Sequence, residues 1–309
     1  MPKLIVAIVS WNTRDLTRNC LSSLQREVAG LEHETWVVDN HSSDDSVQMI
    51  RGEFPPVVLI ENTKNVGFAR ANNQILREAR GDYYLLLNSD TIVPPGSIRT
   101  LCRFMDEHPE AAAVGPRLHN GQGSVEPPLK PLPSLSGEWR YCLAYHSGPL
   151  AAISRRLMRN RLVDWHSIKG PTESEVLSAA CLLIRRTVID QIGLLAEDYF
   201  LFSEENDYFT RMKAAGLRGY YLPDVEIVHL LGMSRKKRAS YDSEVNFFRS
   251  RLLYFRKFYP GRARIVRLIY YLFFGWSSVW SRLSGLFKSE HESDQVALYS
   301  RLLDVLKAG

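Results

Sequence analysis

Cysteine is scarce in this sequence, and its few copies are widely separated. The 309 residues include 4 cysteines, and none of them is spaced like a pair of metal ligands. This scarcity argues against a disulfide framework and favours a reducing, cytoplasmic compartment.

Long apolar runs are also missing. The run at residues 4–9 is shorter than the core of a signal peptide and fits a first buried strand. The uncharged stretch 268–281 is shorter than the roughly 20 residues that a spanning helix needs. The sequence therefore predicts neither a secretion signal nor a transmembrane helix.

The overall composition is that of a soluble globular protein, with 45% hydrophobic and 24% charged residues. The net charge of +5 permits an anionic substrate or surface. Much of the excess positive charge lies at residues 235–238 and 249–267, beside apolar residues. A nucleic-acid groove would instead spread basic and stacking aromatic residues along one face, so we expect no nucleic-acid partner.

The first 120 residues alternate between strand-like and helix-like patterns. Short β-branched or apolar runs predict strands at 3–9, 36–38, 57–60 and 83–87, and helical spacing predicts helices at 14–29, 44–51 and 67–80. This alternation predicts a parallel sheet with helices on both faces. A long loop at 120–137, a helix at 138–163, a strand at 177–184, helices at 186–195 and 204–215, and a strand at 225–228 follow.

The C-terminal region differs in character. Aromatic and basic residues alternate in 245–259, and 265–280 are apolar with arginines on both flanks. We expect one domain over 1–240, divided near 118, and a helical region over 241–309 with amphipathic helices. Tryptophan, tyrosine and flanking charge favour binding of 262–288 to a membrane surface. Packing on the core, or on a second copy in a homodimer, is the alternative.

Polar residues follow the predicted strands at their carboxyl ends, where ligands bind in open α/β sheets. Asp39 and Asn40 end the second strand, and Asp39 has the chemistry to accept a hydrogen bond from a uracil or thymine ring. Asn88, Ser89 and Asp90 end the fourth strand, and Asp90 has the chemistry to bind Mg²⁺ or Mn²⁺ beside a diphosphate. Taken alone, each motif is better explained by turn formation or helix capping.

Three later motifs add candidates. Asn65, Gly67 and Arg70 open a helix whose N-terminus could bind an anion; plain capping is the alternative. Glu204, Glu205 and Asp207 crowd carboxylates beside an apolar run, which favours either a general base or an acidic helix start. His229 follows a short strand, where a single histidine is more often structural.

Seven segments occur in the order found in glycosyltransferase family 2, and together they resemble its bacterial rhamnosyltransferase-like members. They are VAIVSWN (6–12), VVDNHSSD (37–44), NVGFARANN (65–73), LLNSD (86–90), SAACLLIRR (178–186), YFLFSEEND (199–207) and HLLGMS (229–234). The resemblance covers about residues 3–235. It implies a GT-A nucleotide-binding fold with a mostly parallel sheet, and an inverting reaction.

The resemblance also implies roles for individual residues. Glu205 is the expected base, with Glu204 as competitor, and Asp90 with His229 would hold Mg²⁺ or Mn²⁺. The expected donor-binding set is Ser10, Asn12, Asp39, Asn40, Asn65, Gly67, Arg70, Asn88 and Ser89. Ala179, Ala180 and Asp207 are expected on the acceptor side.

This sequence departs from the family pattern at four positions. Asn88 replaces an acidic residue, Glu205 replaces aspartate, Ala179 replaces glycine and Ala196 replaces aspartate. The first weakens the predicted metal site by one carboxylate, and the second leaves Glu204 as a competing base.

The implied activity is transfer of a sugar from a nucleotide donor. We expect rhamnose from dTDP-rhamnose, or another UDP- or dTDP-hexose, to pass to a lipid-linked or cell-surface glycan. The enzyme would work at the cytoplasmic face of the cell membrane. A non-catalytic sugar-binding or scaffold protein on the same fold is the main alternative, and a nucleotidyltransferase would need a glycine-rich loop that residues 11–14 lack.

Overall fold

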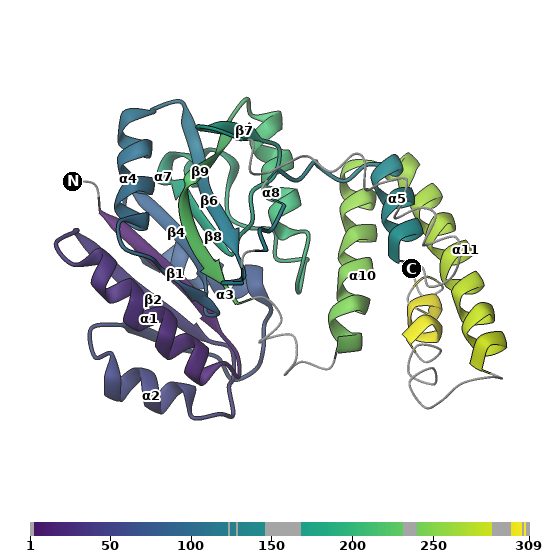
Figure 1. Cartoon of the computed structure of the whole chain (residues 1–309), viewed down its shortest axis with the longest axis horizontal. Helices are drawn as coiled ribbons and strands as arrows, with labels where there is room; N and C mark the ends of the chain where they lie inside the picture. Colours follow the sequence, from purple (N-terminus) through teal and green to yellow (C-terminus); the bar gives the residue numbers. More distant parts are fainter. Residues whose placement is uncertain are drawn as a thin grey trace. The chain divides into compact units, whose positions relative to one another are not determined.

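A computed structural model describes residues 3–122, 124–127, 129–145, 168–230, 240–285, 298–304 and 306. The chain divides into two units (Figure 1): one comprises residues 1–132 and 165–237, the other 133–164 and 238–309. The predicted domain 1–240 included the helix that begins at 135, whereas in the structure this helix groups with the C-terminal helices. The predicted helix beyond residue 145, and residues 231–239, lie outside the described residues.

The first unit is built on a sheet of nine strands in the described part, in the order β3-β2-β1-β4-β8-β6-β9-β5, with β7 paired to β9. Its first half is the predicted parallel sheet, formed by β1 (Leu4–Ser10), β2 (His33–Asp39), β3 (Val58–Glu61) and β4 (Tyr83–Asn88). The helices α1 (Arg14–Val28), α2 (Ser46–Glu53) and α3 (Phe68–Glu78) connect them. The alternating pattern thus predicted this half correctly.

The second half of the sheet is mixed. Strand β8 (Cys181–Arg185) runs antiparallel to both β4 and β6 (Ala111–His119), and β6 pairs in parallel with β9 (Arg218–His229). The short strands β5 (Thr91–Ile92) and β7 (Thr172–Ser174) pair antiparallel with β9. Helices α4 (Ser97–Glu107), α7 (Arg186–Ile192) and α8 (Glu204–Ala214) complete the unit.

Alternate residues of the central strands face two separate hydrophobic cores. In β1, Leu4, Val6 and Ile8 pack with the apolar stripe of α1, whereas Ile5 and Ala7 pack with α3. Because helices cover both faces, a central strand is buried on both sides and its sequence is continuously apolar. This is the physical reason why β1 and β4 were recognisable from sequence.

Strand β9 is much longer than the four residues predicted. Pro223, Asp224 and Glu226 interrupt its apolar pattern, but along the strand buried residues largely alternate with exposed ones. A strand with one solvated face has this period of two. Strand β5, with two residues, is too short to give any pattern.

The second unit contains α5 (Leu135–Tyr145), α10 (Ser240–Phe258), α11 (Pro260–Gly285) and the helical residues 298–304. Its core is aromatic: Phe248 packs edge-on against Tyr270 and Phe274. A buried Glu138 accepts a hydrogen bond from the Tyr270 hydroxyl and lies 3.2 Å from the Arg251 guanidinium. Among the described residues, no helix is both long and apolar enough to cross a bilayer.

Candidate active site

The strand register brings the predicted site residues to one edge of the sheet. Ser10 is paired with Asp39 across β1 and β2, and Val9 is paired with Asn88 across β1 and β4. The carboxyl ends of these strands therefore lie side by side, as parallel pairing requires. Asp90 lies in the short connection between the end of β4 at Asn88 and the start of β5 at Thr91.

Pairing of β5 with β9 brings Asp90 next to His229, which lies 139 residues further along the chain. Thr91 pairs with His229, and the Leu230 N–H donates to the Asp90 carbonyl oxygen at 2.9 Å. The His229 Nε2 atom consequently lies 3.2 Å from Asp90 Oδ1 and 3.4 Å from Asn88 Nδ2. The predicted association of Asp90 with His229 is thus a feature of this fold.

Glu126 completes this group and was not predicted from the sequence. Its Oε1 atom lies 2.5 Å from His229 Nδ1. Burial by itself would lower the pKa of His229, but the hydrogen bonds to Asp90 and Glu126 raise it to about 9. A lone glutamate in a proline-rich loop carries no sequence signal for this role.

Asp90 and His229 fit a divalent metal, although no three His, Cys, Asp or Glu side chains of the described residues form a metal-binding group by themselves. Neighbouring ligand atoms in an octahedral Mg²⁺ or Mn²⁺ site lie about 3 Å apart, close to the Asp90–His229 separation. Such sites commonly take one or two protein ligands and complete their shell with phosphate oxygens and water.

Asp39 has one buried carboxylate oxygen without a partner. Its Oδ2 accepts from the Ser42 N–H at 2.8 Å, while the buried Oδ1 accepts no hydrogen bond in the described structure. An unsatisfied buried carboxylate oxygen is costly, so its persistence points to a donor that a ligand supplies.

Most other residues expected to bind the donor have side chains that hydrogen-bond to neighbouring strands and loops of the protein. Ser10 is fully buried in a hydroxyl cluster with Thr13 and Thr17, and Thr13 also bonds the Ser89 hydroxyl. Asn12 Oδ1 accepts from the Ser43 N–H, and Asn40 Oδ1 accepts from Asn62 and Val66. These side chains hold the edge in place, and their polar atoms are occupied.

At the start of α3, where an anion site is predicted, two backbone amides are already hydrogen-bonded. The Gly67 N–H donates to Asn65 Oδ1, and the Phe68 N–H donates to the Phe200 carbonyl oxygen. These amides are therefore not available to a phosphate. Arg70 lies 3.8 Å from Glu197 and also bonds the Glu197 carbonyl oxygen.

Position 67 requires glycine because of its backbone conformation and its contact with Phe200. Its φ is +86°, and a Cβ built there would lie 2.4 Å from the Phe200 carbonyl oxygen. The backbone of 200–203 thus packs directly on the start of α3. Phe202 and Ser203 also adopt positive φ values, which is rare for residues other than glycine and concentrates at functional sites.

The two candidate bases at the start of α8 lie in different environments. Glu204 is buried, with its Oε2 atom unpartnered, and Glu205 is half-buried. Burial raises the pKa of Glu204 well above its ordinary value, and the charge of Glu205 adds to this. Of these two carboxyl groups, Glu205 is the one that is partly accessible to solvent.

The residues expected on the acceptor side do not form one open pocket. Asp207, expected on the acceptor side, has a fully buried carboxylate, and its Oδ1 atom lies 2.7 Å from Arg211 Nε. This carboxylate is therefore not exposed to an acceptor. Ala180 is buried and its carbonyl oxygen accepts from the Asn88 N–H, while Ala179 is half-buried.

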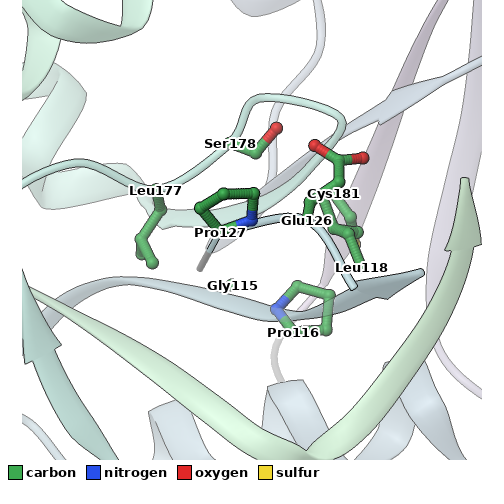
Figure 2. Close-up of a pocket in the computed structure, with 8 residues that line it drawn as sticks. All are labelled: Gly115, Pro116, Leu118, Glu126, Pro127, Leu177, Ser178 and Cys181. Carbon is green, nitrogen blue, oxygen red and sulfur yellow. The ribbon is translucent and has the colours of Figure 1, made fainter. Parts of the chain in front are cut away.

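A narrow pocket lies beside these residues (Figure 2), lined by Gly115, Pro116, Leu118, Glu126, Pro127, Leu177, Ser178 and Cys181. Its volume of about 10 Å³ suits one water molecule, not a sugar. A larger groove of about 400 Å³ lies near His33 at the amino end of β2, away from the site edge.

The family model for glycosyl transferase family 2 matches residues 5–193. The chain belongs to glycosyltransferase family 2. This confirms the resemblance drawn from the seven segments.

Relatives with known names agree with this membership. This family 2 chain is 30% identical over 206 residues to an N-acetylglucosaminyl-diphospho-decaprenol L-rhamnosyltransferase of Mycobacterium tuberculosis. The match covers 62% of this chain and 65% of the relative, so the chain spans less than two thirds of that protein. Glycosyltransferase SunS of Bacillus phage SPbeta is 23% identical over 184 residues, covering 57% of this chain and 42% of its own.

Solved structures support the fold. A mannosyltransferase from Pyrobaculum calidifontis, in complex with GDP-Man and Mn²⁺, superposes with a TM-score of 0.59 at 14% identity, covering 99% of this chain and 86% of that one. GalNAc-T7 with UDP, GalNAc and Mn²⁺ gives a TM-score of 0.56 at 15% identity, covering 81% and 47%. The predicted GT-A fold of this family 2 enzyme, with its largely parallel central sheet, is thus confirmed.

Proposed function

We propose that this enzyme transfers rhamnose, or another hexose, from a dTDP- or UDP-sugar to a hydroxyl of a lipid-linked glycan, with inversion. The observation that carries the donor class is the unpartnered Asp39 Oδ1. The N3–H of thymine or uracil is a donor that this oxygen lacks, whereas cytosine presents an acceptor at N3. The name of the mycobacterial relative supports rhamnose and a lipid-linked acceptor.

The proposed metal ligands are Asp90 Oδ1 and His229 Nε2, which face each other at 3.2 Å. Mg²⁺ or Mn²⁺ bound there would stabilise the negative charge that develops on the leaving diphosphate. The Mn²⁺ present in the mannosyltransferase structure and in the GalNAc-T7 structure supports this choice.

Glu205 is the proposed general base. It takes the proton of the acceptor hydroxyl as that oxygen bonds to the anomeric carbon and the bond from this carbon to the diphosphate oxygen breaks. The nucleoside diphosphate leaves with the bonding electrons, so the configuration inverts. Glu204 is buried whereas Glu205 is half-buried, so Glu205 is the carboxylate that an acceptor hydroxyl can reach.

The donor assignment is tested by calorimetric titration of purified protein with dTDP-rhamnose, UDP-glucose and GDP-mannose, each with and without Mn²⁺. We expect tighter, Mn²⁺-dependent binding of a pyrimidine donor, lost in Asp90→Ala and kept in Asp190→Ala, an exposed aspartate paired with Arg186. Preference for GDP-mannose would refute the assignment of Asp39.

Catalysis is tested separately with Glu205→Gln. We expect unchanged donor binding and turnover reduced by about 10²–10⁴-fold, the usual contribution of a general base. The matched control is Glu173→Gln, at an exposed position on β7. Full turnover in Glu205→Gln would refute its role, and absence of turnover in the wild type with every acceptor would favour the scaffold alternative.

We further propose that α11 docks the enzyme on the cytoplasmic face of the membrane. One face of this helix exposes apolar residues at helical spacing, with exposed fractions of 48–58%: Ile265, Leu268, Tyr271, Leu272, Trp276 and Val279. The opposite face is buried in its own unit through Val266, Tyr270 and Phe274. Exposed Arg262 and Arg264 at the start of α11 suit anionic headgroups.

Docking is measured by co-sedimentation with vesicles of anionic or neutral phospholipid. We expect binding to anionic vesicles, lost in Leu268→Glu/Leu272→Glu and kept in Val58→Glu, which adds a single negative charge at an exposed valine of β3. Undiminished sedimentation of the double variant would refute this part of the proposal. Self-association of the wild type that the double variant abolishes, without vesicle binding, would favour the homodimer.

A further inference from the structure

The imidazole of His229 is held from both sides by carboxylates. Nε2 lies 3.2 Å from Asp90 Oδ1, and Nδ1 lies 2.5 Å from Glu126 Oε1. The three side chains are 9%, 7% and 13% exposed, in the order His229, Asp90 and Glu126. Neither ring nitrogen is therefore open to solvent, and the orientation of the ring depends on these two neighbours.

The fold places Glu126 beside His229 through a tight hairpin at the end of β6. His119 bridges Val125 in antiparallel fashion, and the Glu126 N–H donates to the Leu118 carbonyl oxygen at 2.9 Å. Strand β6 in turn runs parallel to β9, with His119 paired to Val228. The backbone of Glu126 is thus anchored one strand away from the histidine, although 103 residues separate them in sequence.

We propose that Glu126 is a positioning residue that fixes the tautomer and orientation of His229 for metal binding. This inference rests on the metal dependence proposed above. A carboxylate at Nδ1 keeps a hydrogen on that nitrogen, so Nε2 is the nitrogen that can bind a metal beside Asp90 once its own hydrogen is released. A carboxylate behind a ligating histidine also raises the basicity of the ring and prevents it from turning.

Glu126 contacts both the proposed metal site and the pocket next to the segment expected on the acceptor side. Its carboxylate holds His229, while its side chain lines the pocket beside Ser178 (Figure 2). Ser178 precedes the Ala179–Ala180 segment expected on the acceptor side. The long loop predicted at 120–137 thereby supplies a residue to the proposed metal site.

The test measures Mn²⁺ binding by electron paramagnetic resonance of the free ion, with and without dTDP. Glu126→Gln keeps an acceptor for Nδ1 and removes the charge; Glu126→Leu removes both. We expect Mn²⁺ affinity to fall about 10-fold in the first and about 100-fold in the second, the range for residues behind metal ligands. Metal-free dTDP affinity and the melting temperature of Glu126→Gln should not change.

Glu226→Gln is the matched control, because Glu226 lies three residues before His229 and is 52% exposed. We expect it to bind Mn²⁺ as the wild type does. Wild-type Mn²⁺ affinity in Glu126→Gln and Glu126→Leu, alongside loss of binding in Asp90→Ala, would overturn the role of Glu126 alone. Retention of Mn²⁺ binding in Asp90→Ala would instead overturn the proposed metal site.

Discussion

Gly67 offers a sharp test of how the base is positioned. Replacement by alanine introduces a Cβ 2.4 Å from the Phe200 carbonyl oxygen, whereas real Cβ atoms essentially never approach within 3.0 Å. The carbonyl must retreat by more than half an ångström, and it takes the backbone before Glu204 and Glu205 with it. The backbone at φ +86° and ψ 173° is also strained for any L-residue.

The magnitude follows from these contacts. Backbone strain of this kind costs about 1–3 kcal/mol, and weakening of the hydrogen bond from Phe68 to Phe200 costs about 1 kcal/mol. We expect Gly67→Ala to lower the free energy of unfolding by about 2–4 kcal/mol, and the melting temperature by about 4–16 °C. Displacement of the base should lower kcat by about 10²-fold.

Differential scanning calorimetry and steady-state kinetics measure the two effects. Gly52→Ala is the matched control, because Gly52 lies within α2 and has nothing within 4 Å of a built Cβ. Alanine should leave kcat unchanged there and raise stability by about 0.5–1 kcal/mol. A Gly67→Ala protein with wild-type melting temperature and kcat would refute the contact with Phe200.

Three further predictions address single side chains. In Asp39→Asn the Ser42 N–H will donate to the new amide oxygen, so the amide NH₂ group faces the nucleotide base. Calorimetry should then show dTDP binding about 10–100-fold weaker and CDP binding relatively stronger. Arg211→Met removes the ion pair of the buried Asp207 carboxylate, and urea unfolding should show a loss of about 3–5 kcal/mol, recovered in part by adding Asp207→Asn. Burial raises the pKa of Glu204 in the folded state. Its contribution to the free energy of unfolding is therefore complete below its unfolded pKa and is lost as the pH rises through its folded pKa. Relative to Glu204→Gln, the free energy of unfolding of the wild type should fall by up to about 1.4 kcal/mol per pH unit above about pH 4.5. An equal pH dependence in both proteins would contradict the burial of Glu204.

Local patterns sufficed for the parallel half of the fold. Strands β1 and β4 are buried on both faces, and helix α1 carries one apolar stripe, so their sequences alone predict their structure. The residues that end β1, β2 and β4 were identifiable as site candidates because parallel strands bring their carboxyl ends to one edge. The order of seven short segments was sufficient to identify the family.

What local patterns could not supply was the role of each side chain at that edge. Asp39, Asn40 and Ser10 look alike as polar residues at strand ends, yet only Asp39 keeps an oxygen without a partner. Which atoms are already bonded depends on loops from distant parts of the chain. The contact of Gly67 with the Phe200 carbonyl oxygen and the ion pair of Asp207 with Arg211 are two further contacts that the sequence did not predict.

The sequence by itself determined the family, the parallel half of the sheet and the residue types available for binding a pyrimidine nucleotide and a metal ion. Only the tertiary structure decided that Asp90, His229 and Glu126 lie together, because β5, β6 and β9 are neighbours in the sheet but far apart along the chain. It also distinguished Glu204 from Glu205, since burial separates two adjacent carboxyls of nearly identical chemistry. Both decisions depend on long-range pairing and desolvation, which no local pattern encodes.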